Sequence, residues 1–121
     1  MGYIWKEVFA MANTNINVSV LPLDDCELSI RKSSASMSIE YIISIDTYTG
    51  IAYLLDGESR NMILQSEDFG LAGHGVSKDT RASSFRVIVR YLLLRAKVTV
   101  RDPGKAKIID QFCDTVADHM I

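Results

Sequence analysis

The chain has 121 residues, of which 48% are hydrophobic and 23% charged, and its formal net charge at pH 7 is −2. This composition is typical of globular proteins and excludes a disordered or fibrous chain, and the length predicts one domain over residues 1–121. No apolar run reaches the roughly 20 residues that span a bilayer, so we expect no membrane partner and a cytoplasmic location. The two cysteines, Cys26 and Cys113, are too few for a disulfide framework and are expected to be unpaired thiols.

The first third of the chain predicts a short helix and two strands. Residues 1–12 suit a helix with Trp5, Val8 and Phe9 on one face. Met11 is an alternative, internal start of the chain. Residues 15–21 alternate between apolar and polar side chains, which is the period of a half-buried strand. A turn follows at Pro22, and residues 27–31 form the second predicted strand.

Residues 38–65 have the clearest pattern in the chain. Residues 38–46 are rich in β-branched and aromatic side chains, residues 51–55 are apolar, and residues 61–65 resume an extended pattern. The dipeptide Asp56-Gly57, between the second and third of these segments, is a hairpin signal. Three sequential strands joined by tight turns predict an antiparallel meander.

The second half predicts helix, strand and helix. Three glycines precede a helix that is capped at Asp79 or Thr80, runs to about Lys97 and is apolar nearly all round, and its β-branched content leaves a strand as the alternative. Residues 97–101 alternate like a strand, and residues 105–119 form an amphipathic helix. We therefore predict an α+β fold (α/β in the broad sense) in which a mostly antiparallel meander sheet of about five or six strands is followed by helix, strand and helix, with a parallel crossover at this end.

The basic residues are concentrated in one segment. Residues 78–107 contain nine Lys and Arg residues but only two Asp residues, so the rest of the chain carries the excess of acids. Two interpretations remain open: the segment binds an anionic partner such as nucleic acid, or the two parts neutralise each other across the fold. Arg86 and Arg90, four residues apart in the predicted helix, could likewise face phosphates or pair with carboxylates.

The loop before this helix carries a family resemblance. It reads Gly70-Leu71-Ala72-Gly73-His74-Gly75-Val76-Ser77-Lys78, and it lies between the meander and a helix–strand–helix unit. This order of elements and the Gly-x-Gly-Val-Ser-Lys run resemble the GNAT superfamily of N-acetyltransferases. Glycine permits close backbone approach, and the N–H groups at a helix start suit a pyrophosphate. The family has Arg or Gln where Gly70 stands.

The resemblance implies binding of acetyl-coenzyme A. Its pyrophosphate would lie on five loop residues: Gly73, Gly75, Val76, Ser77 and Lys78. Its pantetheine arm would lie along the backbone of Ile63, Leu64 and Gln65, where the strand splays from a neighbour formed by residues 98–100. By position, Glu67 or Asp68 would be the general base that removes a proton from the acceptor amine. Phe112 stands where the family often has a proton-donating tyrosine.

Three functions follow from these observations. The first is an acetyltransferase acting on an amine, and the alternative is a non-catalytic protein-interaction protein, such as an inhibitor or adaptor, that forms a homodimer through an exposed sheet edge or binds a basic partner. The second alternative is nucleic-acid binding through residues 78–107. No metal site is expected, because the spacing of Cys113, Asp114, Asp118 and His119 puts no pair of good ligands on one helical face.

Overall fold

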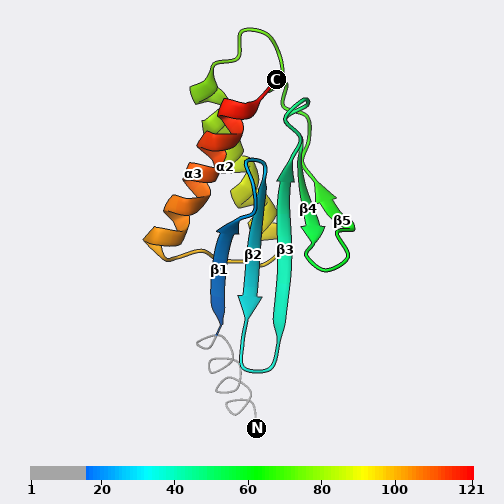
Figure 1. The fold of residues 1–121 in the computed structure, drawn as a ribbon, viewed down its shortest axis with the longest axis vertical. Coiled ribbons are helices and arrows are strands. Elements are labelled where there is room, and N and C mark those ends of the chain that lie inside the picture. Colours follow the sequence, from blue (N-terminus) through cyan, green and yellow to red (C-terminus); the bar gives the residue numbers. More distant parts are fainter. Residues whose placement is uncertain (1–15) are drawn as a thin grey trace, which may run out of the picture.

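The structure, a computed structural model, describes residues 16–121, and the helix expected over residues 1–12 lies outside this range. Five strands form one sheet in the order β1-β2-β3-β4-β5, and every neighbouring pair is antiparallel (Figure 1). The strands are β1 Asn17–Pro22, β2 Glu27–Ser33, β3 Ser38–Ile45, β4 Ala52–Asp56 and β5 Met62–Gln65. Two helices follow, α2 Lys78–Arg95 and α3 Pro103–His119. The predicted meander and the α+β class are confirmed.

Two hairpin loops share the same pattern of hydrogen bonds to an aspartate side chain. In the β3–β4 loop, Asp46 Oδ1 accepts hydrogen bonds from the N–H groups of Tyr48 and Thr49. In the β4–β5 loop, Asp56 Oδ1 accepts hydrogen bonds from the N–H groups of Glu58 and Ser59. These bonds lower the pKa of Asp56. Each loop closes with a left-handed residue four positions after its Asp, Gly50 in the first and Arg60 in the second. The expected Asp56-Gly57 turn is therefore longer than a two-residue hairpin.

One face of the sheet packs on both helices and forms the core. Alternate residues of the strands point to this face, and α3 lies against β1 while α2 lies against β4 (Figure 1). Fully buried side chains from the sheet and both helices meet there: Leu28, Ile30, Ile43, Ile45, Leu54, Phe85, Val89, Leu92, Ile109 and Val116. The apolar face of the sheet, which the alternation of apolar and polar residues predicted, thus packs on the helices in a two-layer arrangement.

Both helices begin earlier than the sequence predicted. Ser77, and not Asp79 or Thr80, caps α2, because its Oγ accepts a hydrogen bond from the N–H of Thr80 at 3.1 Å. Asp102 caps α3 in the same way by accepting from the N–H groups of Gly104 and Lys105. The expected turn at residues 102–104 is thus the first turn of α3, with Pro103 in the position where proline is favoured.

The strand predicted over residues 97–101 is not formed, and neither is the parallel crossover. Lys97 ends α2 in a left-handed conformation (φ 58°), with its N–H bonded to the carbonyl of Leu94. The chain then crosses directly to α3, with Val98 buried and Val100 half-buried against the end of the core. The alternation that predicted a strand here reflects one side of a connecting segment packing on the core, and within residues 16–121 this segment joins no sheet.

Candidate functional site

The glycine loop lies where the sequence placed it, between β5 and the start of α2. Gly70 and Gly75 have positive φ values of 70° and 85°, a conformation that other residues rarely adopt. The N–H of Gly73 bonds to the carbonyl of Gly70. Gly70 and Val76 line a groove of about 460 Å³, but its remaining lining comes mostly from apolar side chains of the loop and α2. The loop therefore presents an apolar surface next to the helix start.

Two of the residues expected to hold the pyrophosphate are engaged within the fold. The Oγ of Ser77 caps α2, and the ammonium of Lys78 pairs with the carboxylate of Asp118 on α3. A hydrogen bond from Lys78 to this carboxylate raises the pKa of Lys78. Both partners of the pair are about half exposed, so its contribution to stability is small. A phosphate at the loop would have to compete with Asp118 for this cation.

The residues expected along the pantetheine arm form β5. Ile63, Leu64 and Gln65 belong to an edge strand that pairs with β4, with a register shift in β4 between Leu54 and Leu55. The neighbour expected to splay away, residues 98–100, is the connecting segment between the helices. The described residues thus lack the two parted strands that the resemblance requires for the pantetheine arm, and acetyl-coenzyme A binding stays a prediction.

The expected catalytic residues lie on the loop after β5. Glu67 and Asp68 are both exposed, and Asp68 Oδ1 accepts a hydrogen bond from the N–H of Gly70 at 2.9 Å. Asp68 thereby fixes the start of the glycine loop. Phe112 is 97% buried within the core, where its ring packs among the apolar side chains of α2 and the sheet. Within residues 16–121, no three His, Cys, Asp or Glu side chains gather as a metal-ligand set.

The arginines of α2 pair with carboxylates of α3. Arg86 Nη2 lies 2.6 Å from Asp114 Oδ1, and Arg90 Nη2 lies 3.0 Å from Asp110 Oδ1. The neutralising interpretation therefore holds for the middle of the basic segment. All four side chains are partly exposed, so these pairs align the helices more than they stabilise them.

An exposed apolar surface lies along the boundary between β5 and α2, and we call it the β5–α2 seam. Ile63, Phe69, Val87 and Tyr91 line grooves there, and Leu94 continues the exposed stripe of α2; the five side chains are between 47% and 71% exposed. Val87, Tyr91 and Leu94 follow the i, i+4, i+7 spacing of one helical stripe. Sequence reasoning missed this surface, although a helix that is apolar nearly all round must present one apolar stripe to something beyond its own core.

Charges of opposite sign flank the two ends of the seam. A groove of about 470 Å³ joins Gln65 and Glu67, at the end of β5, to Val87 and Tyr91. A second groove of about 330 Å³ joins Ile63, near the start of β5, to Arg95 at the end of α2. Strand and helix therefore run antiparallel along the seam, with an acidic end and a basic end.

Comparisons with protein-family models, with curated proteins and with solved structures give no match. None of the described helices combines the length and the apolar character that crossing a membrane requires.

Proposed function

We propose that this chain is a protein-interaction module that forms a homodimer through the edge of β5 and the β5–α2 seam. The observation that carries the proposal is the composition of β5. Its four residues, Met-Ile-Leu-Gln, contain neither a charge nor a proline, and they lie at an edge of the sheet. Natural proteins usually protect such an edge with charges, proline or a covering segment, because its free N–H and C=O groups pair with other strands.

A second copy of the chain suits this edge because the seam is complementary to itself. In a two-fold dimer, β5 of one copy pairs antiparallel with β5 of the other and extends the sheet. The two-fold axis then passes near the middle of β5, so the acidic end of one seam meets the basic end of the other. Glu67 of each copy approaches Arg95 of its partner, and the apolar stripes of the two α2 helices face each other.

The size of the apolar surface supports the same conclusion. The five side chains of the seam are about half exposed or more, and two aromatic rings, Phe69 and Tyr91, are among them. Together they form an apolar patch on the scale of the ~300–600 Å² of the largest patch on a typical monomer, which is often functional. In a dimer, the paired edge strands would add to the area that each partner buries.

Sedimentation velocity over a dilution series, combined with a charge exchange, tests the proposal. The wild-type chain should sediment as a dimer that dissociates on dilution. Glu67→Lys and Arg95→Glu should each weaken the dimer through like-charge repulsion, and the double variant should recover most of the loss. Lys107→Glu, an exposed change on α3 away from the seam, is the matched control. A monomer at every concentration, or losses that simply add in the double variant, would contradict the proposed dimer.

A further inference from the structure

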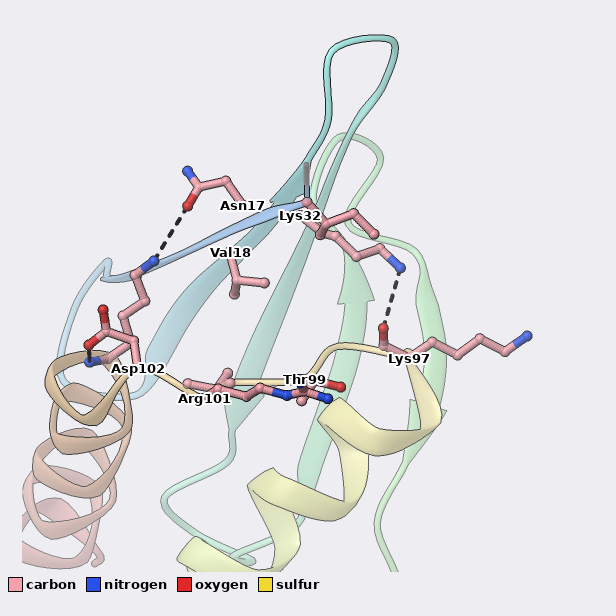
Figure 2. Close-up of a pocket in the computed structure, with 10 residues that line it drawn as sticks. Asn17, Val18, Lys32, Lys97, Thr99, Arg101 and Asp102 are labelled. Atoms are coloured by element: carbon pink, nitrogen blue, oxygen red, sulfur yellow. Dashed lines mark hydrogen bonds between the residues drawn. The ribbon is translucent and has the colours of Figure 1, made fainter. Parts of the chain in front are cut away.

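A second surface feature lies outside the seam, at the junction of β1, β2 and the segment that connects the helices. It is a hollow of about 660 Å³ (Figure 2). Lys32 lines it from β2, Arg101 from the connecting segment and Lys105 from the first turn of α3, whereas Lys97 contributes its backbone carbonyl and its side chain points away (Figure 2). Three cations that are distant in the sequence thus line one space, which lies within the ~300–1,000 Å³ range of small-molecule sites.

These cations differ from the other basic residues of the same segment. Lys78, Arg86 and Arg90 each pair with a carboxylate of α3. Among the residues that the structure describes, by contrast, none of the three cations of the hollow, Lys32, Arg101 and Lys105, forms an ion pair. Lys32 Nζ contacts the carbonyl of Lys97 at 3.4 Å, and Lys105 Nζ contacts Asn17 Oδ1 at 3.5 Å (Figure 2). Both acceptors are neutral and both distances are long.

The one carboxylate that lines the hollow, Asp102, forms no ion pair with these cations among the described residues. Asp102 Oδ1 accepts hydrogen bonds from the N–H groups of Gly104 at 2.7 Å and of Lys105 at 3.3 Å. It therefore caps α3 and satisfies the N–H groups that would otherwise face the hollow. An anion in the hollow would be held by the side chains, and it would reduce the repulsion among the three cations that line it.

We propose that this hollow binds a polyphosphate group, as free polyphosphate or as the phosphate chain of a nucleoside triphosphate. Several linked phosphates match cations contributed by three separate elements better than a single small anion does. Val18 and Val100 form apolar walls beside the cations, where the rest of a nucleotide could pack. No residue of the seam lines the hollow, although Lys97 lines both the hollow and the groove at the basic end of the seam, and this inference does not rest on the proposed dimer.

Isothermal titration with sodium tripolyphosphate and with ATP, both without magnesium, tests the proposal. We expect saturable binding of both ligands. Equal affinities would assign recognition to the phosphate chain alone, and tighter binding of ATP would add the nucleoside. No saturable binding of either ligand at millimolar concentration would overturn the inference. Binding of a single-stranded oligonucleotide that tripolyphosphate fails to displace would overturn it in favour of nucleic-acid recognition.

Charge variants locate the site. Arg101→Gln and Lys105→Gln should each weaken tripolyphosphate binding about tenfold, the scale of one charge-assisted hydrogen bond. Lys107→Gln, an exposed lysine on α3 that does not line the hollow, should leave binding unchanged. Asp102→Asn keeps a capping side chain but removes the negative charge, so it should tighten binding. Equal affinities for all these variants would place the anion elsewhere and refute the assignment.

Discussion

Replacing Leu94 by glutamate probes the proposed dimer most directly. Leu94 is 71% exposed in the monomer, so the substitution creates no cavity, and glutamate is a good helix former. Covering a whole leucine side chain contributes about 1.5–3 kcal/mol, so covering the exposed part contributes about 1–2 kcal/mol. The two-fold axis doubles this effect to about 2–4 kcal/mol, which corresponds to a dissociation constant raised by roughly 30- to 1,000-fold. Desolvation of two carboxylates adds to the loss.

Sedimentation velocity of Leu94→Glu over the wild-type dilution range measures this loss. Thermal unfolding at a concentration where the wild type is monomeric should be nearly unchanged, which separates association from folding. Leu23→Glu is the matched control, because Leu23 is also exposed (48%) but lies in the turn between β1 and β2, away from β5. A Leu94→Glu protein that dimerises with wild-type affinity would refute the participation of the α2 stripe.

Three further predictions concern the fold. In Gly57→Ala, the new Cβ would lie 2.5 Å from Glu40 Cγ and 2.6 Å from its Cβ, so denaturant unfolding should show a loss of about 1–3 kcal/mol, and an unchanged midpoint would refute this contact. Asp102→Ala should cost about 1 kcal/mol of unfolding free energy, whereas Asp102→Asn should cost little, and equal losses would exclude the capping role. Burial, and then the charge of Asp110, raises the pKa of Cys113 from 9.0 to about 12. The folded state therefore binds this proton more tightly than the unfolded state, so stability is retained below pH 9 and falls as the pH rises from 9 towards 12. Cys113→Ala should make this alkaline decline shallower by up to about 1.4 kcal/mol per pH unit, and identical slopes would contradict the shift.

The sequence predicted the strands well because their signals are local. Alternation places Leu28 and Ile30, or Ile43 and Ile45, on one face whatever the rest of the chain does, and the Asp-containing loops mark where strands end. The segment 97–101 was predicted wrongly because Val98 and Val100 alternate for another reason. An extended segment that covers the end of a core buries every second residue too, and periodicity alone cannot show whether a neighbouring strand is available.

The candidate sites were harder to predict because they depend on distant parts of the chain. The basic segment of residues 78–107 was visible in the sequence, but the sequence did not show which of its cations pair with acids. Residues of α2 that face α3 find Asp110, Asp114 and Asp118, whereas the cations around the α2–α3 connection find none of these acids within reach. Lys32, which completes the hollow, lies 65 residues before Lys97. The folded arrangement, in which α3 returns alongside α2 after a sheet that ends in β5, decides which cations pair with acids and which line the hollow.

The two proposed sites follow from one feature of this architecture. Two helices cover one face of a five-stranded sheet, so α3 covers the β1 side, and α2, on the β4 side, is left with an apolar stripe beside β5. The same crossing from α2 to α3 passes the end of β1 and β2 and brings Arg101 and the carbonyl of Lys97 to the hollow that Lys32 lines. The apolar stripe calls for a protein surface, and the converging cations call for an anion. Because these requirements arise on separate surfaces, a variant at one site should leave the other intact: Leu94→Glu should bind tripolyphosphate normally, and Arg101→Gln should dimerise normally.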